Sequence, residues 1–174
     1  IKKGNKQSLL KALDILNIVL KKLNHDSFLF NLKGIILQKL DRTEESIKCY
    51  QISHNLDNKN ISPLNNLAHI YQIESNWELA KKYFDKVSDL DPNNPIYLIN
   101  ISNFYQSIKK IEKSSSILEK AIKITPNDSK LLFNLANNYS NSGEFNKSIE
   151  LFKKIINGNK YFFPAYPQLV KLEK

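Results

Sequence analysis

The chain has 174 residues, of which 41% are hydrophobic and 25% charged, and its formal net charge is +9 at pH 7. No apolar run approaches the roughly 20 residues that a membrane-spanning helix requires, so we expect no membrane span. The low content of glycine (4) and proline (6) argues against a turn-rich β fold.

The positive charge comes almost entirely from lysine, since Arg42 is the only arginine. A planar guanidinium suits phosphates and base edges better than an ammonium, so we expect no specific nucleic-acid partner and mainly solvated lysines. A functional basic patch is the alternative. Cys49, the only cysteine, is expected to pack as a small apolar residue.

The sequence begins Ile-Lys-Lys-Gly-Asn-Lys, without the apolar segment or cleavage site of a signal peptide, and it contains no methionine. We therefore expect a piece of a longer protein, or a processed one. The single cysteine and the absence of a visible signal favour a cytoplasmic location.

Small and large residues recur along the chain with a period of 34 residues, which is typical of a solenoid. One position of the period is always small: Ala12, Ser46, Ala80, Ser114 and Ser148. Another is always large and apolar: Leu16, Tyr50, Phe84, Leu118 and Phe152.

The period divides the chain, in order, into a partial unit, four full units and a last partial unit. Residues 1–26 are the first partial unit, in which residues 7–24 are expected to form a second helix. The full units are residues 27–60, 61–94, 95–128 and 129–162, and residues 163–174 are expected to form the first helix of a further unit or a cap.

Each full unit is expected to fold as two amphipathic helices, as residues 61–94 illustrate. Two sets of residues in this unit have the spacing of one helical face: Leu64, Leu67, Ala68 and Tyr71, then Trp77, Ala80 and Phe84. Glu74-Ser75-Asn76 is the expected turn, and Asp91-Pro92-Asn93-Asn94 ends the unit because proline cannot continue a helix. We expect the small residues of the two helices to face each other, which permits close approach.

These segments resemble the tetratricopeptide repeat (TPR). The resemblance rests on Leu64-Asn-Asn-Leu-Ala-His-Ile-Tyr71 with the apolar residues that follow it, and on Leu132-Phe-Asn-Leu-Ala-Asn-Asn-Tyr139 with Gly143. It implies an all-α superhelix, a TPR solenoid of antiparallel hairpins with about ten helices. It also implies that the first helices line a concave side that binds a protein or peptide partner.

Three amide-rich columns are expected on the first helices, away from their buried face. They are Asn66, Asn100 and Asn134; His69, Asn103 and Asn137; and Gln38, Gln72 and Gln106. An amide both donates and accepts hydrogen bonds, so such columns are suited to holding the backbone of an extended peptide. Similar asparagine ladders hold protein substrates in the repeat arm of O-linked N-acetylglucosamine transferases. The alternative is that these amides stabilise the fold or reflect composition.

Another ligand mode of the family is the carboxylate clamp of its chaperone-binding members. Lys130 is a lone candidate for such a clamp, because the column of Asn31, Asn65, Ile99 and Phe133 is amide or apolar. We therefore disfavour that ligand class. Ile99 and Phe133 either form an apolar pocket for a side-chain anchor or pack against neighbouring helices.

The sequence shows no catalytic constellation. The three histidines lack the spacing of a metal site, and the glycines do not cluster into a phosphate loop. We therefore expect no catalysis, no metal and no cofactor, and we expect a scaffold that binds another polypeptide.

Two alternative functions stay open. Residues 160–174 resemble the last helix before the catalytic domain in bacterial repeat-fused sulfotransferases and glycosyltransferases, which suggests a substrate-recruiting arm. The other alternative is a homo-oligomer through uncovered end helices. The residues expected on those uncovered faces are Leu9, Leu13 and Leu16, and Leu169, Val170 and Leu172.

Overall fold

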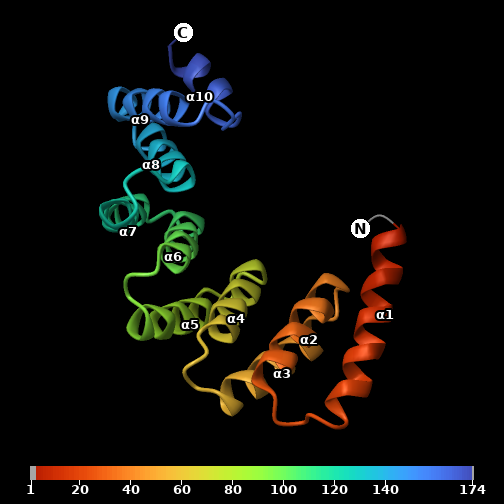
Figure 1. Ribbon diagram of the computed structural model, residues 1–174. Helices are drawn as coiled ribbons and strands as arrows, with labels where there is room; N and C mark the ends of the chain where they lie inside the picture. The colour runs from red at the N-terminus through yellow and green to blue at the C-terminus, as the bar shows by residue number, and fades with distance from the viewer. Residues whose placement is uncertain (1–2, 174) are drawn as a thin grey trace. The chain divides into compact units, whose positions relative to one another are not determined.

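The computed structural model describes residues 3–173, which contain ten α-helices and no strand (Figure 1). The helices are α1 (Lys3–Leu20), α2 (Ser27–Lys39), α3 (Thr43–Leu56), α4 (Ser62–Ile73), α5 (Trp77–Leu90), α6 (Pro95–Ser107), α7 (Ile111–Ile124), α8 (Ser129–Asn141), α9 (Phe145–Gly158) and α10 (Ala165–Leu172). The predicted all-α fold is confirmed. None of these ten helices is both long and apolar enough to cross a bilayer.

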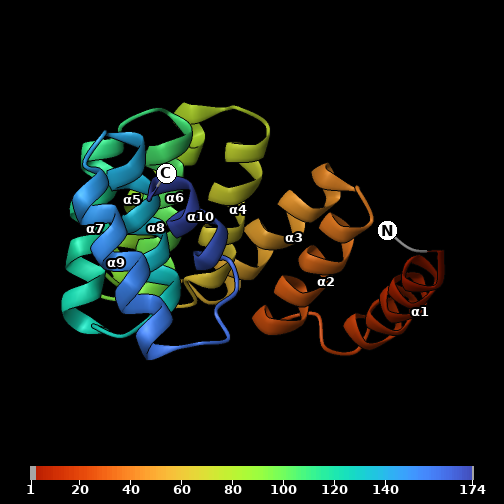
Figure 2. The same ribbon diagram turned by 90° about the horizontal axis from the view of Figure 1, so that it is seen from above.

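The chain divides into two compact units, unit 1 (Ile1–Leu90) and unit 2 (Asp91–Lys174). In unit 1, α2 pairs with α3 and α4 pairs with α5, while α1 packs on α2 and α3 packs on α4. In unit 2, α6 pairs with α7 and α8 pairs with α9, while α7 packs on α8 and α10 packs on α9. Figure 2 shows the two helices of a hairpin side by side.

Each unit has its own apolar core. In unit 1, one cluster joins residues of α1, α2 and α3, and a second surrounds Tyr50, Leu67 and Ile70. In unit 2, one cluster includes Leu118 and Leu131, and another includes Phe152, Ile155 and Ala165. The large residues of the period therefore fill the space between neighbouring helices.

The small residues lie where the two helices of a hairpin meet. Ser46 Oγ donates to the carbonyl oxygen of Gly34 at 2.8 Å, and Ser148 Oγ donates to that of Ala136 at 2.7 Å. A Cβ atom at residue 34 would lie 2.6 Å from Cε1 of Tyr50, so this glycine makes room for the tyrosine ring. The structure thus agrees with the prediction that short side chains permit the close approach.

The turn inside each hairpin contains one residue in the left-handed region. These residues are Asp41, Ser75, Lys109 and Gly143, with φ of 60°, 58°, 59° and 81°. They recur with the 34-residue period, so all four hairpins share one turn geometry. The turn expected at residues 74–76 lies between α4 and α5 as predicted.

Several first helices begin at a side-chain cap. Asp26, Asn94 and Asp128 precede α2, α6 and α8, and each side chain accepts a hydrogen bond from a backbone N–H of the first turn. Such caps satisfy donors that the helix itself leaves unpaired. The polar residues between the repeats therefore fix where these helices start.

The expectation of an uncovered face on α1 is wrong for the residues named. Leu13 and Leu16 are only 4% and 7% exposed, because they pack against Ile36 and Leu37 of α2, and Leu9 packs against the same cluster. Their i, i+3 spacing marked a helical face, and that face is the one that contacts the next helix. Ile15 is 62% exposed instead.

The expectation fails in the same way on α10. Leu169 and Leu172 are partly buried against the cluster that contains Phe152 and Ile155. Of the three residues named, Val170 alone is exposed.

Candidate protein-binding site

The predicted site residues are divided between the two units. Unit 1 holds Gln38 on α2 and Asn66, His69 and Gln72 on α4. Unit 2 holds Asn100, Asn103 and Gln106 on α6, and Lys130, Asn134 and Asn137 on α8. All ten lie on first helices of their hairpins.

In unit 1, two of the predicted amides form hydrogen bonds with other side chains of the protein. Asn66 Nδ2 donates to Oδ1 of Asn31 at 3.1 Å, which links α4 to α2. The hydroxyl of the buried Tyr50 donates to Oε1 of Gln38 at 3.0 Å. Burial raises the pKa of Tyr50 to about 12.

In unit 2, Gln106 belongs to a polar network that joins three helices. Gln106 Nε2 donates to Oδ1 of Asn138, and Asn138 Nδ2 donates to Oγ of Ser114 at 2.8 Å. Asn138 and Ser114 are fully buried. The network connects α6, α7 and α8, and its Asn138–Ser114 bond is buried away from competing water.

Asn138 is not among the predicted site residues, although the period contains a signal for it. In the other three 34-residue repeats, the equivalent positions are Ile36, Ile70 and Phe104, which are all buried. A polar residue in a column of buried apolar residues requires an internal partner. That break in the column is the signal.

Three predicted amides of unit 2 remain open. Asn103, Asn134 and Asn137 are partly buried, and among residues 6–173 their side chains have no hydrogen-bond partner. Asn103 lies one turn from Gln106 on α6, and Asn134 lies one turn from Asn138 on α8. Unused donors and acceptors therefore lie close to the bond that joins these two helices.

Other predicted positions differ in their surroundings. His69 and Lys130 are exposed. Gln72 and Asn100 are partly buried and make further contacts within the protein. The amide columns thus contain both internal structural contacts and open groups.

Ile99 and Phe133 pack against neighbouring helices. Ile99 contacts the cluster around Leu118. The ring of Phe133 meets Phe152 and Phe162 edge to face, with centroid distances of 5.8 and 5.4 Å. Of the two alternatives for this pair, the structure shows packing.

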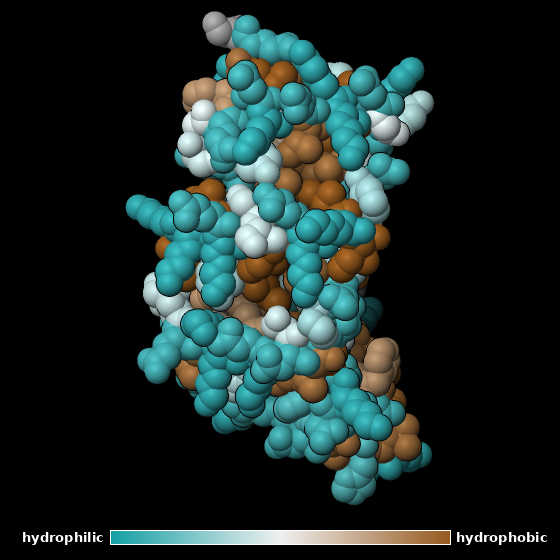
Figure 3. Space-filling model, turned by 90° about the vertical axis from the view of Figure 1, so that its left-hand side faces the viewer, coloured by the Kyte–Doolittle hydropathy of each residue, from teal (hydrophilic) through white to brown (hydrophobic). Residues whose placement is uncertain are grey.

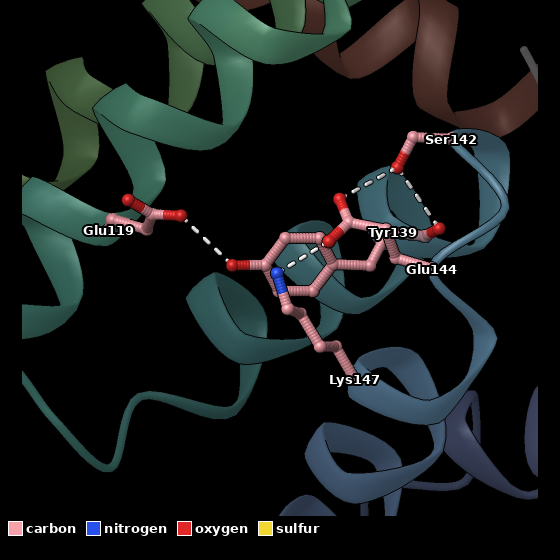
Figure 4. A network of polar contacts seen from close by, with 5 residues as sticks. All are labelled: Glu119, Tyr139, Ser142, Glu144 and Lys147. Atoms are coloured by element: carbon pink, nitrogen blue, oxygen red, sulfur yellow. Dashed lines mark hydrogen bonds and ion pairs between the residues drawn. The ribbon is translucent and has the colours of Figure 1, made fainter.

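A polar cluster in unit 2 surrounds Tyr139 (Figure 4). The Tyr139 hydroxyl donates to a carboxylate oxygen of Glu119 at 2.9 Å, while Lys147 pairs with Glu144 and lies 5.1 Å from the centre of the tyrosine ring. Ser142 Oγ donates to the carbonyl oxygen of Tyr139 at 3.1 Å. Burial, followed by the bond to Glu119, raises the pKa of Tyr139 to about 12.

The contact between lysine and tyrosine in this cluster repeats in the preceding hairpin. Lys113 and Tyr105 occupy the equivalent positions, and the Lys113 ammonium lies 4.5 Å from the ring centre of Tyr105. The period therefore contains a sequence signal for this contact, the tyrosine–lysine spacing of eight residues, although the contact was not predicted. The Glu119 contact has no such signal.

The lysines of the second helices are exposed, and several have specific contacts. Lys120 Nζ donates to the carbonyl oxygen of Pro92 at 2.8 Å, and Lys154 Nζ donates to that of Pro126 at 3.3 Å. Each bond ties a second helix to the turn before its own hairpin. Figure 3 shows a mainly hydrophilic surface in which hydrophobic groups appear between the polar side chains.

The described residues contain no group of three or more His, Cys, Asp or Glu that is placed to hold a metal ion. Cys49 is buried among apolar side chains, and burial raises the pKa of its thiol. The amide and hydroxyl side chains described above are suited to hydrogen bonding.

Comparisons with known proteins identify the repeat. One family model described as tetratricopeptide repeat matches residues 61–94 and 96–128, and a second with that description matches residues 117–150. No curated protein matches the sequence significantly.

Solved structures share the fold at low sequence identity. A tetratricopeptide repeat protein from Parabacteroides merdae is 18% identical, with a TM-score of 0.80 over 97% of this chain and 67% of that one. PilF of Pseudomonas aeruginosa is 20% identical, with a TM-score of 0.76 over 84% of this chain and 67% of that one. YrrB, a TPR protein described as having an unusual peptide-binding site, is 13% identical, with a TM-score of 0.69 over 90% of this chain and 81% of that one.

The helix hairpins, their 34-residue period and the matches to the repeat models agree with one another. Repeats of this kind generally mediate protein–protein interaction. The chain belongs to the tetratricopeptide-repeat family.

Proposed function

We propose that the chain is a protein-binding scaffold that holds an extended peptide on α6 and α8 of unit 2. The observation that carries the proposal is the set of open amides, Asn103, Asn134 and Asn137. Each offers one acceptor and two donor hydrogens at a partly buried position. An extended peptide presents the complementary groups along its backbone, so these amides bind it with little regard to its sequence.

Position and charge both support unit 2 as the binding element. In unit 1, Asn66 and Gln38 already have internal partners, and each makes a bond that stabilises the fold. In unit 2, Lys130 adds an exposed positive charge at the start of α8, close in sequence to the open amides. We therefore expect a modest preference for peptides that carry an acidic group.

The peptide-binding site in the printed description of YrrB belongs to that protein. It supports the proposal only as an example of a related fold that holds a peptide. The hypothesis of a substrate-recruiting arm stays a prediction. Such an arm would hold its substrate polypeptide by the same kind of contacts.

The test begins with selection of binding peptides from a displayed random library and continues with their affinity for two triple variants. The first is Asn103→Ala with Asn134→Ala and Asn137→Ala. If each lost hydrogen bond is worth about 0.5–1.5 kcal/mol, the affinity should fall by roughly tenfold or more. Fluorescence anisotropy of a labelled selected peptide measures the change.

The matched control replaces three exposed asparagines of the same unit: Asn93→Ala, Asn127→Ala and Asn146→Ala. This variant loses the same number of amides and should bind like the unmodified protein. Equal affinities for both triple variants would show that α6 and α8 do not hold the peptide. Circular dichroism confirms that both variants keep their helices.

A further inference from the structure

Two surface hollows occupy equivalent places in the two units, beside the turn within a hairpin. In unit 1, a hollow of about 460 Å³ is lined by Asp41, Arg42, Thr43, Glu44, Glu45 and Glu74, which we name the acidic turn. In unit 2, a hollow of about 390 Å³ is lined by Lys109, Lys110, Ile111, Glu112, Lys113 and Ser142, which we name the basic turn. Every residue of the second set lies two repeat periods after its counterpart in the first.

The two turns have the same backbone and opposite charge. Asp41 and Lys109 share the left-handed conformation, with φ of 60° and 59°. Asp41 is replaced by Lys109, and Glu45 by Lys113, at equivalent positions. The acidic turn has four carboxylates and one guanidinium, whereas the basic turn has three ammonium groups and one carboxylate.

Much of this charge is not neutralised within the protein. Nη2 of Arg42 lies 2.6 Å from Oε2 of Glu45. Asp41, Glu44 and Glu74 have no ion-pair partner among the side chains described for residues 6–173. On the basic turn, Lys113 lies over the Tyr105 ring.

The other two lysines of the basic turn also carry a charge that no ion pair neutralises. Lys109 and Lys110 are exposed and form no ion pair with any described residue. Each turn thus presents a net charge to solvent, of opposite sign.

Exposed apolar side chains lie beside both turns. Ile73 directly precedes Glu74 and is 65% exposed, and Trp77 follows Glu74 by three residues and is 40% exposed. Phe145 occupies the position equivalent to Trp77 in the α8–α9 hairpin and is 52% exposed. Aromatic anchors beside complementary charges are typical of protein interfaces.

We propose that the acidic turn of one molecule docks on the basic turn of a second copy of this chain. The two surfaces have net charges of opposite sign and exposed aromatic residues at equivalent positions. Because each copy carries one turn of each kind, the contact is heterologous and can continue from copy to copy. The residues involved are separate from the amides of the proposed peptide site.

Exposed ion pairs contribute little individually and are screened by salt. We therefore expect weak association that grows with protein concentration. Sedimentation velocity should show oligomers at about 0.01 M salt and monomers at about 1 M, as the Debye length falls from about 30 Å to about 3 Å. Wild-type protein that is monomeric at both salt concentrations, even when concentrated, would overturn the proposal.

Charge reversal provides the specific test. The variant Asp41→Lys with Glu74→Lys makes the acidic turn positive, and the variant Lys109→Asp with Lys110→Glu makes the basic turn negative. Neither variant should self-associate at low salt, because both of its turns then have the same sign. Their equimolar mixture should associate, since every turn again finds an opposite partner.

The backbone tolerates the exchange at the left-handed position, because Asp41 and Lys109 already occupy it in the two units. The matched control, Lys123→Glu with Lys160→Glu, changes the net charge of unit 2 by the same amount at exposed sites and should associate like wild type. If the reversed variants self-associate as the wild type does, or if their mixture stays monomeric, the turns are not the interface. The salt dependence of the wild type tests the idea even if a variant fails to fold.

Discussion

Tyr139 illustrates how one residue links the repeat to the stability of the protein. Burial and the bond to Glu119 raise its pKa to about 12, whereas a tyrosine in an unfolded chain has a pKa of about 10. The phenol is therefore protonated in the folded state at pH values where the unfolded chain ionises. Its contribution to stability is complete below about pH 10 and is lost as the pH rises towards 12.

The raised pKa of Tyr139 predicts how the stability of the Tyr139→Phe variant depends on pH. The free energy of unfolding of the wild type should fall more steeply between about pH 10 and 12 than that of the variant, because the variant has no phenol at this position. Tyr50 also has a raised pKa, but both proteins retain it, so its effect cancels in the difference. Urea unfolding at several pH values measures the slopes; parallel slopes would contradict the assignment.

At the residue scale, the sequence could predict where the amides lie but not which of them are open. The period places Asn66, Gln106 and Asn134 on first helices, and the structure agrees. Whether an amide is open depends on the residue that faces it from a neighbouring repeat, such as Asn31 for Asn66. That pairing depends on side-chain direction, which a one-dimensional period does not contain.

At the scale of elements, the Gln106–Asn138–Ser114 network holds neighbouring hairpins of unit 2 together through polar bonds. The equivalent place of Asn138 in α4 is taken by Ile70, which packs in an apolar cluster. The fold therefore accommodates either a buried apolar side chain or a buried, hydrogen-bonded amide at this position. In the hydrogen-bonded case, each group depends on its partner, since a buried group without one is costly.

We predict that Asn138→Ile lowers the free energy of unfolding by about 1–3 kcal/mol, because Ser114 Oγ loses its donor in a fully buried site. Adding Ser114→Ala, which copies Ala80 of another hairpin, should recover part of the loss by removing the unpaired hydroxyl. Urea unfolding measures both effects.

The matched control is Asn141→Ile, which introduces the same side chain at an exposed position of α8. It should change the stability by less than about 0.5 kcal/mol. Equal losses for residues 138 and 141 would indicate that helix propensity, rather than the network, is responsible.

The helices themselves were largely predictable, because the apolar spacing and the turn residues agree over the whole period. The α4–α5 turn lies where the pattern places it. The faces of the end helices were not predictable in the same way. An apolar stripe shows that a face is buried, but it does not show which neighbour buries it. Leu13 and Leu16, expected on an uncovered face, pack against α2.

At the scale of the whole molecule, repeat proteins differ from globular domains because each hairpin contacts mainly its neighbours. Here the four apolar clusters described above each lie within a single unit. A local defect should therefore weaken its own unit more than the other. Gly34 is a suitable place to create such a defect.

We predict that Gly34→Ala destabilises unit 1 selectively. Its new Cβ would lie 2.6 Å from the ring of Tyr50, which is fully buried, and such overpacking costs about 1–3 kcal/mol. Alanine's higher helix propensity offsets at most about 1 kcal/mol of this cost. Hydrogen exchange should show faster exchange in α2, α3 and their neighbours α1 and α4, and little change in α8 and α9.

Gly158→Ala is the control, because a Cβ at residue 158 would meet no atom within 4 Å. It should leave exchange unchanged throughout the chain or slow it slightly in α9, since alanine favours the helix. If Gly34→Ala accelerates exchange equally in both units, the chain unfolds as one cooperative block. In that case its stability is not a sum of neighbouring repeats, and a mutation in unit 1 would also weaken the peptide contacts proposed for α6 and α8.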